Sequence, residues 1–294
     1  MKTTTKTHYR QRITKVMDYI HDHLDGELDV NTLADVALMS PYHFHRIYRE
    51  LAQETVNATV RRLRLQSAAV ELIRSDRSLS SIATMVCYQS LEAFSRAFSK
   101  QFGESPGQYR LSKAYKNHQD LTPYIAMLPT PKKVDKTMYT VDIQAIEPTQ
   151  LIGYSHQGDY MEIGHVFEKL FIDAQNLDLL NNTSRSFGIY YDDPQTVNTN
   201  ELRSMACISV AADTPLPANS EFETLTIPES KAASLLFKGS YAELPKPYDW
   251  FFGTWLPESG QEPADFPAFE EYLNDPKTTA PNELLTRIYC LLKN

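Results

Sequence analysis

The chain has 294 residues, about twice the length of a typical domain, so we expect two domains. Its composition, 42% hydrophobic and 22% charged, is that of a globular protein and excludes a disordered or fibrous chain. No apolar run approaches the roughly 20 residues that span a bilayer, and the polar N-terminus shows no secretory signal. The three cysteines are far apart and odd in number, which predicts neither a disulfide framework nor a metal site and suits a cytoplasmic protein.

The net charge of −8 conceals a split between the two halves of the chain. Residues 1–115 carry 16 Lys and Arg against 12 Asp and Glu, a net charge of +4. Residues 116–294 carry 13 against 25, a net charge of −12. This asymmetry predicts a mildly basic half suited to polyanions and an acidic half that repels them.

Helical periodicity dominates the first half. Apolar residues recur at helical spacing over 13–24, and Gly26 ends this helix. Asp29 or Asn31 is placed to cap a short second helix, and a third helix begins at Pro41. Two short helices joined by about three residues are typical of a helix-turn-helix.

The same arrangement recurs further along the chain. A longer helix over 60–73 precedes a short helix over 82–86 and a helix over 94–102, which Gly103 and Pro106 end. The first third of the sequence therefore predicts two helix-turn-helix units bridged by one helix.

The second helix of each unit leaves polar and basic side chains outside its buried stripe. Side chains of this kind read base edges and bind phosphates when a helix enters the major groove. A solvated surface helix carries similar residues, but the equivalent Arg46 and Arg96 on tandem units favour DNA. The candidate DNA-binding residues are Tyr42, His45, Arg46, Arg49, Ser90, Leu91, Glu92 and Arg96.

Two runs carry a specific pattern, ADVALMSPYHFHRIYRELAQETVNATVRRLRLQSAA and SLSSIATMVCYQSLEAFSRAFSKQFGESPGQYR. Together they resemble the AraC/XylS DNA-binding domain over about residues 8–112. The glycine usual in each turn is replaced by Leu38 and Cys87, where a left-handed conformation is disfavoured, so we expect a tolerated variation of both turns. The resemblance implies that the base-facing positions are Tyr42, His45, Arg46, Leu91, Glu92 and Arg96.

Residues 116–137 contain three prolines and no sustained period, which is typical of a linker. After this stretch, three short motifs recur in the same order about 80 residues later, which predicts a duplicated unit. The pairs are Gly158–Ile163 with Gly239–Leu244, Phe187–Pro194 with Phe269–Pro276, and Asn200–Leu202 with Asn282–Leu284.

Each copy is expected to fold as a β-α-β-β unit. A helix with Val166, Phe167, Leu170 and Phe171 inside belongs to the first copy, and a helix carrying Tyr248, Phe251 and Phe252 belongs to the second. Two such copies related by a pseudo-twofold axis would leave a cleft where they meet. The expected strands lie near 141–156, 186–191 and 204–211, and near 222–238, 267–273 and 284–292.

The motifs GIYYDDP, GSYAEL, FEEYLNDP and ELLTRIYCLL resemble the GyrI-like effector-binding domain of drug- and metabolite-responsive regulators, over about residues 138–294. The resemblance implies a buried glutamate at Glu270. Strand parity agrees, because Glu270 and Tyr272 share one face while Phe269 and Glu271 share the other. Gly188 would leave space opposite Glu270, and Glu271 remains the alternative because the register rests on one alignment.

A carboxylate among aromatic faces suits a cationic or polar-aromatic ligand, through charge pairing and cation–π contact. An aromatic residue at helical spacing is more often part of a core, so Tyr248 and Trp250 are open between pocket and core. The candidate effector-binding residues are Glu270, Tyr190, Tyr272, Trp250, Trp255 and Tyr248.

The two resemblances imply a tandem helix-turn-helix DNA-binding domain over 1–115, a linker over 116–137 and an α+β effector domain over 138–294. They imply a transcription regulator whose partners are an operator in double-stranded DNA, a small-molecule effector and RNA polymerase, with no membrane. No cofactor is expected, and His43 and His45 point in nearly opposite directions on a helix and so do not share a metal ion. The alternative is a small-molecule hydrolase or drug-sequestering module, but the sequence offers no nucleophile–base pair, so we expect no enzyme.

Overall fold

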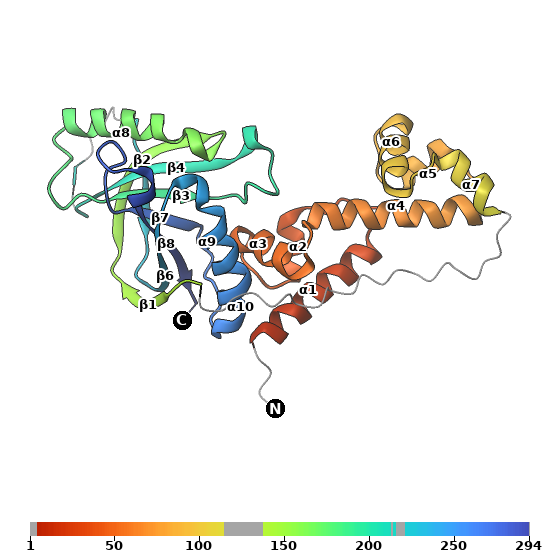
Figure 1. Cartoon of the computed structure of the whole chain (residues 1–294), viewed down its shortest axis with the longest axis horizontal. Coiled ribbons are helices and arrows are strands. Elements are labelled where there is room, and N and C mark those ends of the chain that lie inside the picture. The colour runs from red at the N-terminus through yellow and green to blue at the C-terminus, as the bar shows by residue number, and fades with distance from the viewer. Residues whose placement is uncertain (1–4, 115–137, 213, 216–220, 294) are drawn as a thin grey trace. The chain divides into compact units, whose positions relative to one another are not determined.

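The computed structural model describes residues 5–114, 138–212, 214–215 and 221–293 (Figure 1). The linker predicted over 116–137 lies outside the described residues. The described residues form two compact units. One contains residues 10–38 and 52–114, and the other contains residues 5–9, 39–51 and 138–293.

The predicted helices of the first half are all present, and one further helix follows them. Asp29 caps α2 by accepting hydrogen bonds from the backbone of Asn31 and Thr32, so Asp29 and not Asn31 is the cap. Pro106, which was expected only to end a helix, begins a new one, because its missing N–H is harmless in the first turn. The helices are α1 (Thr5–Asp22), α2 (Val30–Val36), α3 (Pro41–Ala52), α4 (Val56–Arg74), α5 (Leu79–Met85), α6 (Leu91–Phe102) and α7 (Pro106–Ala114).

Helices α4 to α6 of the helical unit share one hydrophobic core, around Leu65, Leu72, Ile82, Phe94 and Phe98 (Figure 1). This core fixes α5 and α6 as the second helix-turn-helix. Both turns of the chain retain the left-handed conformation despite their side chains, with φ 54° at Leu38 and 62° at Cys87. The helix-turn-helix geometry therefore prevails over the local cost of a Cβ atom.

The described residues of the second half form one antiparallel sheet of eight strands, in the order β1-β6-β8-β7-β3-β4-β2-β5. The order reads the same from both edges once the two repeats are superimposed, so a pseudo-twofold axis passes between β3 and β7. The strands are β1 (Val141–Ile146), β2 (Thr149–Gln157), β3 (Ser186–Tyr190), β4 (Arg203–Val210), β5 (Glu223–Ile227), β6 (Ser230–Lys238), β7 (Ala268–Tyr272) and β8 (Leu285–Leu292).

Each repeat has one strand more than predicted. The ranges expected near 141–156 and 222–238 are each split in two, with Pro148 and Pro228 between the halves. A proline has no N–H for the ladder, so the chain changes partners there. As a result β1 pairs with β6 and β5 pairs with β2, and each repeat lends its first strand to the other.

Helices cover one face of the sheet. Helix α8 (Gly164–Asn176) packs there on Ile152, Ala206 and Ile208 (Figure 1). Its counterpart in the second repeat is broken into α9 (Pro245–Trp250), a π-helical turn (Phe251–Trp255) and α10 (Leu256–Ser259). The opposite face carries its own hydrophobic cluster, which includes Phe187 and Phe269. Because side chains alternate along each strand, the sheet carries one hydrophobic cluster under the helices and another on its opposite face.

Candidate functional site

A cavity of about 1180 Å³ lies between α8 and α9, where the two repeats meet. Both repeats line it, in agreement with the cleft predicted at the pseudo-twofold axis. Tyr160 and Tyr241 also line the cavity and were not predicted, although both occupy the same place in a repeated motif. Four of the six candidate effector-binding residues line it, namely Tyr190, Tyr248, Glu270 and Tyr272.

Glu270 projects from β7 into this cavity and is only 3% exposed. Its Oε1 atom accepts a hydrogen bond from the Tyr248 hydroxyl group at 2.9 Å, whereas Oε2 is buried without a partner among the described residues. Burial raises the pKa of Glu270 to about 7, opposed by the hydrogen bond from Tyr248, by the nearby hydroxyl group of Tyr272 and by the charge of Arg46. A buried carboxylate with an unpaired oxygen atom favours a positively charged neighbour.

The aromatic lining around Glu270 follows the symmetry of the repeats. Tyr190 and Tyr272 are equivalent residues, and their hydroxyl oxygen atoms lie 2.6 Å apart. Tyr160 stands edge-on to Tyr190 at 4.8 Å between ring centroids, as Tyr241 does to Tyr272 at 5.5 Å. Burial, the largest cause, raises the pKa of Tyr190 and of Tyr272 far above the usual value, so both remain neutral donors.

The carboxylate breaks this symmetry. Gly188 lies directly opposite Glu270 in the ladder between β3 and β7. A Cβ atom on Gly188 would lie 2.7 Å from the hydroxyl oxygen of Tyr272 and 2.8 Å from the ring of Tyr190. The tyrosines therefore fill the space that glycine leaves, and the first repeat has no carboxylate at the position that Glu270 occupies in the second.

Glu271 points to the other side of the sheet. It accepts a hydrogen bond from the Tyr289 hydroxyl group at 2.8 Å and forms an ion pair with Arg185 at 3.3 Å. Glu271 does not line the cavity, so the structure places Glu270 and not its neighbour at the predicted position.

The two tryptophan residues lie elsewhere. Trp250 is buried against Tyr139, with ring centroids 5.4 Å apart, and Trp255 packs on Phe251 at 5.2 Å. Neither is among the residues that line the cavity, in contrast to the expectation from the sequence. Their helix presents Tyr248 to the cavity instead, because only one face of a helix can point there.

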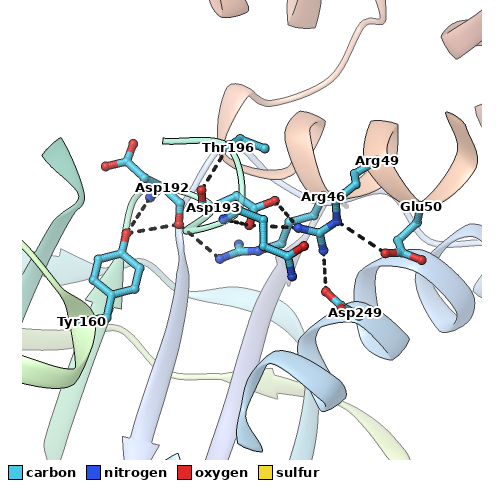
Figure 2. Close-up of polar contacts among 9 residues, drawn as sticks. Arg46, Arg49, Glu50, Tyr160, Asp192, Asp193, Thr196 and Asp249 are labelled. Atoms are coloured by element: carbon cyan, nitrogen blue, oxygen red, sulfur yellow. Dashed lines mark hydrogen bonds and ion pairs between the residues drawn. The ribbon is translucent and has the colours of Figure 1, made fainter. Parts of the chain in front are cut away.

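Helix α3 supplies an unexpected residue to the cavity wall, Arg46. Its guanidinium carbon lies 4.7 Å from the ring centroid of Tyr248 and 5.3 Å from that of Phe252. One guanidinium N–H group of Arg46 donates to the Asp192 carbonyl oxygen at 3.4 Å (Figure 2). Tyr160 donates to the same carbonyl group at 3.1 Å. Arg46 is 5% exposed, so the C-terminal half buries a side chain that was predicted to face DNA.

One helical turn further on, Arg49 is held by two carboxylates (Figure 2). It donates to both carboxylate oxygen atoms of Asp193, at 2.8 and 3.1 Å, and to Asp249 of α9. Asp192 and Asp193 belong to the repeated GIYYDDP motif, which was the only signal in the sequence for this site. The pairing with Arg49 spans 144 residues, so no local pattern could reveal it.

The remaining candidate DNA-binding residues fall into two groups. Tyr42 and His45 on α3 are half-buried, and burial, as the largest cause, lowers the pKa of His45. By contrast, the candidates on α6 and at its N-cap are exposed, and Arg96 forms only an exposed ion pair with Glu92 at 3.6 Å. The exposed group is Ser90, Leu91, Glu92 and Arg96.

The described residues contain no group of three or more His, Cys, Asp or Glu residues that could hold a metal ion. None of the helices they form is both long enough and apolar enough to cross a membrane.

Two family models match the chain. A model of the GyrI-like small molecule binding domain matches residues 139–293, and a model of a helix-turn-helix domain matches residues 33–112. The first covers the sheet and every residue that lines the cavity except Arg46, and the second covers helices α3 to α6 and most of α7.

The curated relatives match about a third of the chain. The uncharacterized HTH-type transcriptional regulator YbfP of Bacillus subtilis (strain 168) is 32% identical over 35% of this chain and 35% of its own length. Regulatory protein SoxS of Salmonella typhimurium is 31% identical over 35% of this chain and 95% of its length. The Right origin-binding protein of Escherichia coli (strain K12) is 32% identical over 34% of this chain and 35% of its length. The match thus spans about a third of YbfP and nearly all of SoxS.

Proposed function

Because the chain belongs to the AraC/XylS family of regulators and carries a GyrI-like small-molecule-binding domain, we propose that it is a DNA-binding transcription regulator controlled by a cationic aromatic effector. It acts in the cytoplasm on an operator, and RNA polymerase is a further partner. The observation that carries the choice of effector is the carboxylate of Glu270, which is buried among tyrosine rings with Oε2 unpartnered in the described part of the chain.

The cavity favours a cation for an electrostatic reason. Ionised Glu270 loses hydration when it is buried, and Tyr248 compensates for only one of its oxygen atoms. A ligand cation beside Oε2 restores the ionised form, and the faces of Tyr160 and Tyr241 add cation–π contact. A neutral ligand of the same shape gains the stacking and not the charge pairing.

A matched pair of probes tests this site. Methyltriphenylphosphonium is a permanent cation, and triphenylphosphine oxide is a neutral molecule of similar shape. Calorimetric titration of the full chain should show the cation losing several kcal/mol of affinity in Glu270→Gln, since the variant keeps the shape and removes the buried charge. The oxide should lose far less.

Glu271→Gln is the matched control, because it changes the same residue type on the opposite face of the same strand. It should leave the affinity for both probes unchanged. Equal losses for the cation and the oxide in Glu270→Gln would assign Glu270 a structural role and overturn the proposed effector class.

DNA binding is tested by selection. Fragments retained by the purified full chain should share a non-palindromic site of about 20 base pairs, because two recognition helices on one chain enter successive major-groove segments about 34 Å apart. Retention of all fragments with equal affinity would contradict sequence-specific binding.

A further inference from the structure

We propose that α3 is an internal ligand of the effector domain: Arg46 takes the place of the effector at the cavity wall, and effector binding releases α3 to DNA. This inference rests on the proposed function and adds its mode of control. It makes the acidic surface around Asp193 and Asp249 the docking site for the chain's own first recognition helix.

Arg46 has the chemistry proposed for the effector. It is a cation on an aromatic face, 4.7 Å from the ring centroid of Tyr248, whose hydroxyl group donates to Glu270. Its positive charge is one of the lesser causes that lower the pKa of Glu270, of Tyr160 and of Tyr248, against the larger effect of burial. A ligand cation that enters the cavity therefore meets a positive charge already in place, and the two compete for the same carboxylate.

Arg49 holds the helix in that position. Its guanidinium group is paired with Asp193, which is buried, and with Asp249, which is half exposed. The pairs join the half of the chain with net charge +4 to the half with net charge −12. Carboxylates placed beside a predicted DNA-binding arginine compete with phosphate for it, because both accept the same paired donors.

The rest of α3 fits the same surface closely. The His43 Nε2 atom donates to the Phe266 carbonyl oxygen at 3.1 Å, and Ser40 donates to Asp265 at 2.9 Å. Gly253 lies in the π-helical turn against Glu50, where a Cβ atom would approach the Cγ atom of Glu50 to 2.2 Å. The absence of a side chain at Gly253 is what allows α3 to approach, so the contact is built by shape as well as by charge.

The docked position excludes the DNA-bound one for this helix. Arg46 is 5% exposed and Arg49 is 9% exposed, so neither can reach a base or a phosphate without leaving the effector domain. Operator and effector then both favour the released helix. By linkage, each must raise the affinity of the other by the same factor.

Two variants release α3 by different means and leave α3 itself unchanged. Gly253→Ala does so by steric overlap with Glu50, without a change of charge. Asp193→Asn combined with Asp249→Asn does so by removing the partners of Arg49. The control for the first is Gly107→Ala on α7, where a Cβ atom meets nothing within 4 Å. The control for the second is Glu147→Gln with Glu229→Gln, which removes the same charge from exposed turns.

Affinity for the selected DNA is measured by fluorescence anisotropy, with and without saturating methyltriphenylphosphonium. In the wild type the cation should raise DNA affinity roughly 5- to 100-fold, the usual range of coupling between sites. Both release variants should reach that affinity without the cation, and Gly253→Ala, which keeps every charge of the cavity, should also bind the cation more tightly, whereas both controls should behave as the wild type.

The outcomes separate this inference from the function it rests on. If calorimetry shows that the cation does not bind the wild type, the proposed effector class fails, and the release variants still test the docking. If the cation binds but DNA affinity is the same with and without it, and the release variants match their controls, internal docking does not control DNA binding. Weaker DNA binding by both release variants would also overturn it.

Discussion

Helices α3 and α6 are the second helices of two units with the same sequence pattern, yet they lie in opposite environments. On α3 the arginines are buried against tyrosine rings and aspartates of the effector domain. On α6 the side chain of Arg96 is 75% exposed and forms an ion pair with the equally exposed Glu92. The same amphipathic pattern thus occurs on an exposed helix and on a helix docked against carboxylates, because a guanidinium group pairs with any anion that presents two acceptor oxygen atoms.

In the mode of control proposed above, this difference gives α3 and α6 separate roles. The α6 face is accessible as it stands, so it can supply the first contact with DNA. The α3 face becomes available only after its ion pairs are broken, so it can carry the control. Four predictions test this division, and their expected effects decrease from the first to the last.

The first prediction compares the two ion pairs. Asp193→Ala leaves Arg49 without its buried partner and should lower the stability of docked α3 by about 3 kcal/mol. Glu92→Ala removes an exposed pair on α6 and should cost at most about 0.5 kcal/mol. Native-state hydrogen exchange of the amides of each helix measures both. Equal loss of protection in α3 and α6 would remove the contrast between them.

The second prediction is a pH dependence of stability in the compact unit that contains both α3 and Glu270. Burial raises the folded-state pKa of Glu270 to about 7 from an ordinary value of 4.5, so the folded chain keeps a proton that the unfolded chain releases. Stability should therefore fall as the pH rises from about 5 to about 7, by roughly 2–3 kcal/mol, and then level off. Urea unfolding of wild type and Glu270→Gln at pH 5 and pH 8 checks this. The stability of Glu270→Gln relative to the wild type should be greater at pH 8 than at pH 5. The same difference in stability at both pH values would show that Glu270 does not cause the pH dependence.

The third prediction concerns DNA affinity. Arg96→Ala should cost roughly 1–3 kcal/mol and relax specificity under α6, whether or not the cation is present. Arg46→Ala should show its full cost only with saturating methyltriphenylphosphonium, since without it the variant also weakens the docking that opposes DNA. Anisotropy titrations with competitor sequences measure both the loss of affinity and the loss of specificity. If either variant bound all sequences equally more weakly, that arginine would be a phosphate contact.

The fourth prediction concerns the two left-handed turns. Leu38→Gly should raise the free energy of unfolding by less than about 1 kcal/mol, which is measured as a small rise in melting temperature. The reason is that Leu38 is 66% exposed and its Cβ atom disfavours the left-handed conformation. Cys87→Gly should gain less, since its Sγ atom lies 3.3 Å from the Asp25 carbonyl oxygen. Gly103→Ala, at φ 79°, should have the opposite sign, and a stabilising effect there would contradict the argument.

Much of the fold follows from local patterns in the sequence. The periodicity of 3.6 residues locates the helices, and the repeated motifs locate both copies of the effector domain and the axis between them. Strand parity assigns Glu270 and Glu271 to opposite faces, which the structure confirms. The strands β1 and β5 were not predicted as separate strands, because each expected range continued through a proline into the next strand.

The site itself depends on information that no local pattern contains. Periodicity states which side chains share a face of α3, and it does not state what covers that face. The partners of Arg49 lie 144 and 200 residues away, and Trp250 turns into the core while Tyr248 turns into the cavity. Spacing in the sequence predicts the helices and the repeats, and the resemblance to the GyrI-like domain implies the buried carboxylate at Glu270. Only the tertiary structure decided that Arg46 and Arg49 lie against that domain, because long-range charge pairing and close packing at Gly253 exist only once the chain has folded.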